Sequence, residues 1–228
     1  MFLPKINLKT GDRGVIFFTL PEWKLAKEKI SLKKHFSWLN LTIKYDAKGF
    51  ICGPILGAPM IGLLFEIFQN WEIKELLTVG WAAKLGEKLK LGEVFLPNKA
   101  YSLEGTSRLY WEKRKVFTPE FEFFTKIKEN LVQIGLMPSS GPIISTDAPF
   151  IFEKNTQFLN KWATKAYALD METSAVFALG KYFNVKTQAI LLITDEIGRT
   201  SFQRPENLLK PSREKILELI QRFLSHEV

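Results

Sequence analysis

The feature that most constrains the fold of this chain is the alternation of short apolar runs with helical patterns along most of its length. The run GVIFFTL (14–20) is continuously apolar, as a fully buried strand is, and Pro21 then opens a helical pattern. The alternation continues along the chain, with a strand pattern at 75–80, a helix pattern at 173–182 and a strand pattern at 185–195. This order predicts a single α/β domain over residues 1–228, built around a mixed, largely buried sheet.

The other elements are predicted from turn residues and hydrophobic spacing. The segment LTIKYDAKGFICG (41–53) is typical of a hairpin with DAKG as its turn. Both histidines, His35 and His226, are expected on surface helices, which argues against a His-based triad or a His-rich metal site. The remaining predicted strands are 92–102, 141–150, 164–169 and 185–195, and the predicted helices are 21–30, 59–71, 119–135, 173–182 and 212–225.

Composition excludes several classes of protein. With 228 residues, 46% of them hydrophobic, the chain can bury a substantial core. The single cysteine, Cys52, excludes an intrachain disulfide and a cysteine-rich zinc site, and without a signal-peptide pattern it favours a cytoplasmic location. No apolar run reaches the roughly 18–20 residues needed to cross a bilayer, so no membrane association is expected.

The positive charge does not by itself indicate a nucleic-acid partner. Lys and Arg number 32 against 24 Asp and Glu, a formal net charge of +8. The lysines are scattered through amphipathic segments such as WKLAKEKISLKKHF, where each can lie on a solvated face, and no RNP or zinc-finger pattern occurs. We therefore expect no nucleic-acid binding.

Two carboxylates stand at the junction where an apolar strand meets an apolar helix, in the stretch ALDMETSAVF. Asp170 and Glu172 flank Met171 there, at the carboxyl end of a strand, where ligands collect in α/β folds. A third acid, Asp195, follows the apolar run AILLIT, and we expect it to be partly desolvated. The alternative for all three acids is a capping or turn role beside a helix N-terminus.

Several segments together resemble the purine nucleoside phosphorylase and uridine phosphorylase superfamily, which also includes methylthioadenosine nucleosidases. They are GPILGAPMIGLLFEIF with the VGWAAKL turn after it, ISTDAPF, ALDMETSAVFALGKYFNV and AILLITDEIG, in the order and spacing of that superfamily. The resemblance implies a three-layer α/β/α fold with a partly closed central sheet. It also implies a homo-oligomer (dimer, trimer or hexamer) that cleaves the N-glycosidic bond of a nucleoside without a metal or organic cofactor.

The resemblance assigns roles to the acidic junction. Glu172 resembles the glutamate that accepts hydrogen bonds from the ribose hydroxyls, and Met171 would pack against the sugar, with Asp170 as helper or helix cap. Asp195 matches the aspartate that protonates or hydrogen-bonds N7 of a purine, which favours a purine base. Phe150 resembles an aromatic residue that stacks on the base or sugar, and its alternative is a core aromatic.

The residues that would handle the nucleophile match less closely. The turn Gly80, Trp81 and Ala82 resembles the substrate-binding turn, yet Thr78 stands where phosphorylases carry a phosphate-binding arginine. Glu22 lies near the position of the glutamate that activates water in nucleosidases.

Two arginines, Arg199 and Arg204, could close over the site from the loop after Asp195. Three functions remain open: phosphorolysis with phosphate as co-substrate, hydrolysis, and non-catalytic nucleoside binding with Trp81 filling the nucleophile space.

Overall fold

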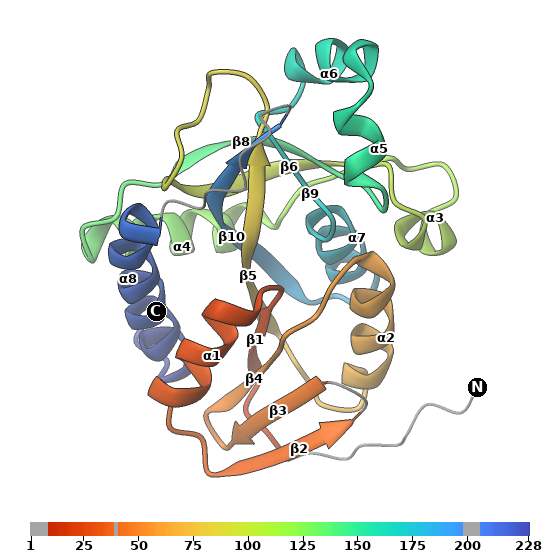
Figure 1. Cartoon of the computed structure of the whole chain (residues 1–228). Helices are drawn as coiled ribbons and strands as arrows, with labels where there is room; N and C mark the ends of the chain where they lie inside the picture. The colour runs from red at the N-terminus through yellow and green to blue at the C-terminus, as the bar shows by residue number, and fades with distance from the viewer. Residues whose placement is uncertain (1–8, 39–40, 198–205) are drawn as a thin grey trace.

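The computed structural model describes residues 9–38, 41–197 and 206–228, and shows one large mixed sheet covered by helices on both faces (Figure 1). The strands are β1 Arg13–Phe17, β2 Lys34–Trp38, β3 Leu41–Asp46, β4 Gly49–Gly53, β5 Glu75–Lys84, β6 Val94–Ser102, β7 Val116–Phe117, β8 Ser139–Ser145, β9 Ala168–Asp170 and β10 Lys186–Glu196. The helices are α1 Leu20–Lys29, α2 Ala58–Phe68, α3 Thr106–Tyr110, α4 Phe121–Gln133, α5 Pro149–Glu153, α6 Thr156–Ala163, α7 Thr173–Tyr182 and α8 Glu206–Leu224.

The sheet has an open part and a closed part. The open part runs from β5 through β1, β4 and β3 to the edge strand β2. In the closed part, β5, β10, β6, β8 and β9 pair in a ring, because β10 pairs with β5 as well as with β6. This arrangement confirms the predicted mixed, partly closed central sheet. The long strand β5 belongs to both parts, because it pairs with β1 as well as with β9 and β10.

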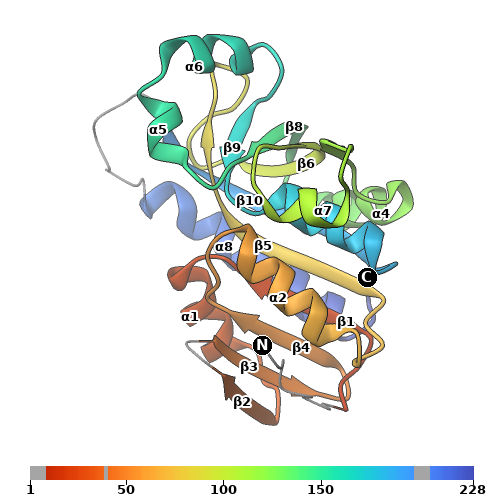
Figure 2. The same ribbon diagram turned by 90° about the vertical axis from the view of Figure 1, so that its right-hand side faces the viewer.

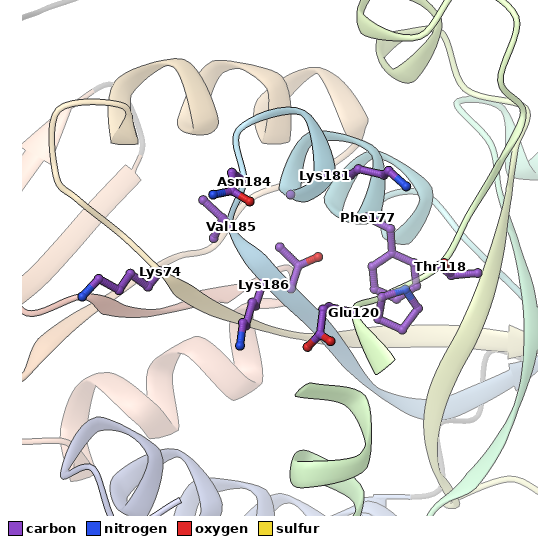
Figure 3. Close-up of a pocket in the computed structure, with 11 residues that line it drawn as sticks. Lys74, Thr118, Glu120, Phe177, Lys181, Asn184, Val185 and Lys186 are labelled. Atoms are coloured by element: carbon purple, nitrogen blue, oxygen red, sulfur yellow. The ribbon is translucent and has the colours of Figure 1, made fainter. Parts of the chain in front are cut away.

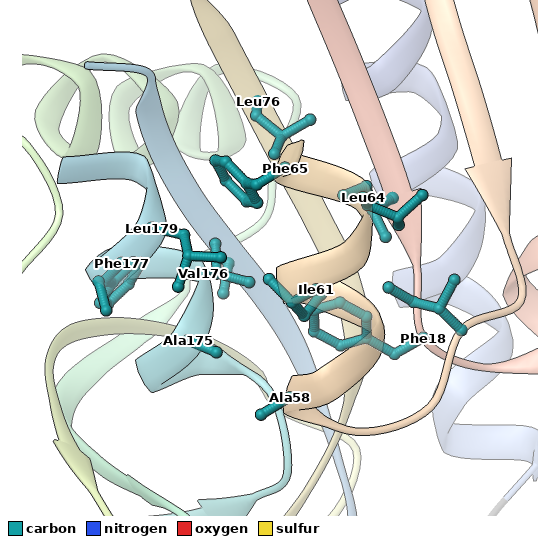
Figure 4. Packing of buried hydrophobic residues seen from close by; sticks show 14 of the residues in the cluster. Phe18, Ala58, Ile61, Leu64, Phe65, Leu76, Ala175, Val176, Phe177 and Leu179 are labelled. Carbon is teal, nitrogen blue, oxygen red and sulfur yellow. The ribbon is translucent and has the colours of Figure 1, made fainter. Parts of the chain in front are cut away.

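Two apolar clusters fill the space between the sheet and its helices. One contains Ile61, Phe65 and Val176 and lies between the sheet and helices α2 and α7 (Figure 4). The other contains Phe123, Ile216 and Leu219 and lies beneath α4 and α8, with α1 beside them. Helices cover both faces of the sheet in the perpendicular view as well (Figure 2), so the fold has the three predicted layers.

Helix α7 is mostly apolar, and its first eight residues are buried on every side. Its residues from Thr173 to Gly180 are all buried, and α2, α3 and the sheet surround it. A helix that is hydrophobic all round belongs in a protein interior. The two acids that precede α7 are therefore carried into the interior with its first turn.

Several predicted elements differ from the observed ones. His35 lies in strand β2 and not on a helix, since its segment pairs with β3 and Lys44 faces it in the register. His226 follows α8 in a turn with φ of 61° and is also not helical. The last helix is already formed at Glu206, six positions before the predicted start, and contains Pro211; burial of Leu209 stabilises this first part.

Long-range pairing explains the other differences. The predicted turn after Gly80 is a continuation of β5 to Lys84, because Ala83 and Lys84 pair with both β9 and β10. The strand predicted at 164–169 is shifted and short, spanning Ala168–Asp170. The end of the strand predicted at 141–150 is helix α5. The hairpin at 41–53 is confirmed, with Lys48 N–H donating to Asp46 Oδ1 at 2.8 Å in its turn.

Candidate active site

The strand register brings the predicted acids to one end of the sheet. Ala83 of β5 pairs with Leu169 of β9 on one side and with Asp195 of β10 on the other. Neighbouring strands lie about 4.8 Å apart, so Leu169 and Asp195 are about 10 Å apart, and Asp170 directly follows Leu169. The loop after β1 leaves the sheet at the same end, since β1 runs parallel to β5.

Asp170 serves as the cap of helix α7. Its side chain is buried, and Oδ2 accepts the backbone N–H of Thr173 at 2.9 Å and the Thr173 hydroxyl at 2.5 Å. Oδ1 accepts the hydroxyl of Ser145, from the end of β8, at 2.5 Å. Asp170 thus takes the capping role that was its alternative assignment.

Glu172 occupies the N-cap position of α7 and yet makes no capping hydrogen bond with its side chain. Its Oε1 instead accepts the N–H of Gly57, at the start of α2, at 2.7 Å, and its Oε2 accepts the N–H of Met171 at 3.2 Å. A carboxylate offers about four lone-pair directions, of which these bonds use two. Glu172 therefore keeps accepting capacity for a ligand, beside the partly buried Met171.

The two acids make each other costly to ionise. Burial is the main cause that raises the pKa of Asp170 above its ordinary value, and the hydroxyl and N–H donors around it oppose that rise. Burial also raises the pKa of Glu172, the negative charge of Asp170 raises it further, and the N–H groups of Gly57 and Met171 oppose the rise. A buried carboxylate with a strongly perturbed pKa at the carboxyl end of a strand is typical of a functional site.

Asp195 lies at an irregularity of the sheet. The β5–β10 register shifts between Ile193 and Asp195, and such bulges are frequent next to active sites. The Asp195 side chain is partly buried, and its Oδ2 accepts the Thr194 hydroxyl at 2.6 Å. Asp195 is therefore only partly exposed at this bulge.

Glu22 and Trp81 come together in a second cluster, between α1 and α8. Glu22 is 5% exposed, and its carboxylate accepts the indole N–H of Trp81 at 2.9 Å. Arg213 of α8 donates from Nε to the same Oε1 at 2.6 Å, and the Thr19 hydroxyl donates to Oε2. Sequence reasoning missed Arg213, because nothing local relates it to a residue 191 positions earlier.

The other positions of the predicted substrate-binding turn are covered. A Cβ on Gly80 would lie 2.4 Å from the ring of Phe18, which packs over it, and Ala82 is buried. Thr78 is also buried, and its hydroxyl has no hydrogen-bond partner in the described part of the chain. The backbone of β5 is thus shielded at Thr78, where phosphorylases carry a phosphate-binding arginine, and at Gly80 and Ala82 of the predicted substrate-binding turn.

Phe150 is 63% exposed on helix α5, so the core alternative for this residue is wrong. Its helix follows β8, whose last residue pairs with Asp170. Phe150 therefore projects from the same end of the sheet as the acids. Arg199 and Arg204 lie outside the described residues.

The cavity shown in Figure 3 lies elsewhere. It has a volume of about 560 Å³ and is lined by Lys74, Lys181 and Lys186 around the buried edge of Phe177. Lys186 begins β10, whereas Asp195 is next to its last residue, so the cavity and the acids lie at opposite ends of this strand. We do not assign the candidate site to this cavity, because it contains none of the chemistry described above.

Two further features concern the described residues alone: metal-binding groups and membrane-spanning helices. In residues 9–38, 41–197 and 206–228, no three His, Cys, Asp or Glu side chains gather in a group that could hold a metal ion. Within the same ranges, every helix is too short or too polar to span a bilayer.

Comparisons with known proteins agree with this architecture. A family model described as the phosphorylase superfamily matches residues 15–225. A DeoD-type purine nucleoside phosphorylase from Streptococcus pneumoniae is 27% identical over 151 residues, or 64% of this chain and 63% of the relative. The match thus spans less than two thirds of that curated relative.

Solved structures show the same fold. The purine nucleoside phosphorylase of Toxoplasma gondii, in complex with immucillin-H, has a TM-score of 0.84 at 14% identity, covering 99% of this chain and 98% of the other. A protein assigned as a methylthioadenosine nucleosidase from Weissella paramesenteroides has a TM-score of 0.76 at 13% identity, covering 96% and 99%. Since the family model covers nearly the whole chain, the protein belongs to the phosphorylase superfamily, which includes nucleoside phosphorylases and nucleosidases.

Proposed function

We propose that this protein cleaves the N-glycosidic bond of a purine nucleoside. The observation that carries the proposal is the Glu172 carboxylate, which is buried, bound by two backbone N–H groups, and without a role in capping its own helix. A group so costly to bury is retained where it serves a ligand.

The chemistry needs negative charge near the sugar. As the C–N bond breaks, positive charge develops on the ribose ring and negative charge on the leaving base. Glu172 accepts hydrogen bonds from the ribose hydroxyls, and these bonds strengthen as the sugar becomes cationic. Met171 packs its thioether against the sugar, while Asp170 holds the turn that carries both residues.

The base is handled by two other residues in this proposal. Asp195 donates a proton or a hydrogen bond to N7 of the purine as the base departs; a transferred proton neutralises the base, and a hydrogen bond stabilises its negative charge. Phe150, exposed at the same end of the sheet, stacks on the base or the sugar. Arg199 and Arg204 remain candidates for binding the substrate from the loop after Asp195.

Different observations favour two nucleophiles. Phosphorolysis is the activity named for the Streptococcus pneumoniae relative, and Arg213 supplies a guanidinium close to the loop after β1. Hydrolysis is favoured by Glu22, a buried carboxylate near that loop, and by Thr78 in place of an arginine.

We also propose that the protein is a cytoplasmic homo-oligomer that needs no metal or organic cofactor.

One assay separates these possibilities. The protein is incubated with inosine, adenosine and methylthioadenosine, with and without phosphate, and free base and ribose 1-phosphate are followed by chromatography. Base release that depends on phosphate supports phosphorolysis, and release that is indifferent to phosphate supports hydrolysis. Binding without any release would contradict catalysis and support a nucleoside-binding role, in which the Trp81–Glu22 contact occupies the nucleophile space.

A further inference from the structure

A third buried carboxylate, Glu104, is connected to the acidic pair. It lies in the loop between β6 and α3 and is 0% exposed. In the described part of the chain, no Lys, Arg or His forms an ion pair with it. A buried charge without a cation must be satisfied by hydrogen bonds, or it destabilises the fold.

Neutral donors make three hydrogen bonds to the Glu104 carboxylate. Its Oε1 accepts the Ser102 hydroxyl at 2.8 Å and the Ser174 hydroxyl at 2.9 Å. Its Oε2 accepts the backbone N–H of Ser107, in the first turn of α3, at 2.9 Å. Glu104 therefore joins the start of α3 to Ser174, the second residue of α7.

The connection continues to the acidic pair. The backbone N–H of Ser174 donates to the Ser145 hydroxyl oxygen at 2.9 Å, and that hydroxyl donates to Asp170 Oδ1 at 2.5 Å. Asp170 in turn accepts the N–H of Thr173. The first turn of α7 is thus held from two sides, by Glu104 and by Asp170, and Glu172 directly precedes this turn.

The direction of these bonds suits a carboxylate at position 104, since all three partners donate to it. Because a carboxylate only accepts, the hydroxyl protons of Ser102 and Ser174 must both point toward it. If the amide nitrogen of a glutamine took the place of Oε2, its N–H groups would face the N–H of Ser107, and two donors would oppose each other. If the nitrogen took the place of Oε1, it would donate to the Ser102 and Ser174 hydroxyls, and the Ser174 hydroxyl proton would lose its fixed direction.

We propose that Glu104 is a positioning residue, which fixes the first turn of α7 so that Glu172 keeps its orientation toward the sugar. The proposal rests on the proposed function of Glu172. Glu104 acts through Ser174, Ser145 and the helix backbone, and it reaches no reacting atom itself.

The test compares Glu104→Gln with a matched control, Glu120→Gln. Glu120 also binds the N-terminus of a helix, accepting the N–H groups of Glu122 and Phe123 at 3.1 and 2.8 Å, but on α4. We expect Glu104→Gln to lower kcat for base release at least about tenfold with KM changed less than about threefold, since transition-state contacts depend most on orientation. Glu120→Gln should leave both constants near wild type. Wild-type kcat in Glu104→Gln would overturn the proposal.

Amide hydrogen exchange decides the question independently of activity. In Glu104→Gln, the amides of Thr173, Ser174 and Val176 should exchange at least about tenfold faster than in wild type, while the amides of β1 and β4 stay unchanged. Unchanged exchange at the start of α7 would overturn the positioning role, even if no nucleoside were cleaved by the wild type. If Glu104→Gln fails to fold, Ser174→Ala removes a single donor and should show the same local acceleration on a smaller scale.

Discussion

The two carboxylate clusters of this protein are built in opposite ways. At the start of α7, Asp170 and Glu172 are surrounded by hydroxyl and backbone N–H donors, and neither forms an ion pair with a cation in the described residues. Beside α1, Glu22 is ion-paired with Arg213 at 2.6 Å and bonded to Trp81. An arginine neutralises Glu22, whereas the carboxyl group of Glu172 has no cation paired with it in the described residues and can bind a ligand beside it.

The two clusters therefore affect the stability of the fold in different ways. An ion pair between a buried glutamate and an arginine is costly to break, because the remaining charge is left unpaired. Two neighbouring buried acids without a cation are costly even when intact, since burial and the charge of Asp170 both oppose the ionisation of Glu172. Removing a charge should therefore destabilise the protein in the Glu22–Arg213 cluster and relieve a cost in the Asp170–Glu172 cluster.

The largest expected effect comes from breaking the ion pair. Arg213→Met leaves Glu22 buried without its guanidinium and should lower the free energy of unfolding by about 3 kcal/mol, measured by urea denaturation. Arg222→Met is the control, because its ion pair with Glu218 is about 40% exposed and should contribute less than about 1 kcal/mol. Equal losses in both variants would show that Glu22 is not stabilised by Arg213.

Glu172→Gln should have the next largest effect, on activity. The amide keeps the size of the side chain but removes the charge that the cationic sugar needs, so kcat/KM for base release should fall at least about tenfold. Thermal unfolding should show that the variant is at least as stable as wild type. Wild-type turnover would sink the assignment of Glu172 to the sugar.

Asp195→Asn should lower turnover at least about tenfold by removing the proton that the base receives. Glu196→Gln is the neighbouring control, since Glu196 lies 3.5 Å from the ammonium of Lys84 and has no assigned role in the chemistry. Base release would be measured for both variants with inosine and adenosine. A loss of the same size in both would point to damage to the end of β10 rather than to loss of the acid.

The smallest expected effect is on the pH dependence of stability. The pKa of Glu172 is raised in the folded protein above its ordinary value of 4.5, so the folded state keeps a proton that the unfolded chain releases. The stability that this proton gives is fully present below about pH 4.5 and is lost as the pH rises through the raised pKa. In urea denaturation from pH 4.5 upward, wild type should therefore lose stability relative to Glu172→Gln. Parallel curves would contradict the raised pKa.

Local patterns predicted much of this molecule. The apolar runs at β1 and β10 and the hairpin of β3 and β4 depend on near neighbours, and so does the burial of Asp170 and Glu172 ahead of an apolar helix. Contacts between distant segments were not predictable. Arg213 reaches Glu22 across 191 positions, Glu104 reaches Ser174 across 70, and ring closure extends β5 beyond Gly80.

The central claim is that Glu172 binds the ribose hydroxyls, and the most direct test varies those hydroxyls together with the carboxylate. The rate of base release, as kcat/KM, is measured for inosine and 2′,3′-dideoxyinosine with wild type and with Glu172→Gln. Wild type should prefer inosine at least about tenfold, and Glu172→Gln should lose most of that preference, because the two changes remove the same hydrogen bonds. An undiminished preference for inosine in Glu172→Gln would contradict the claim.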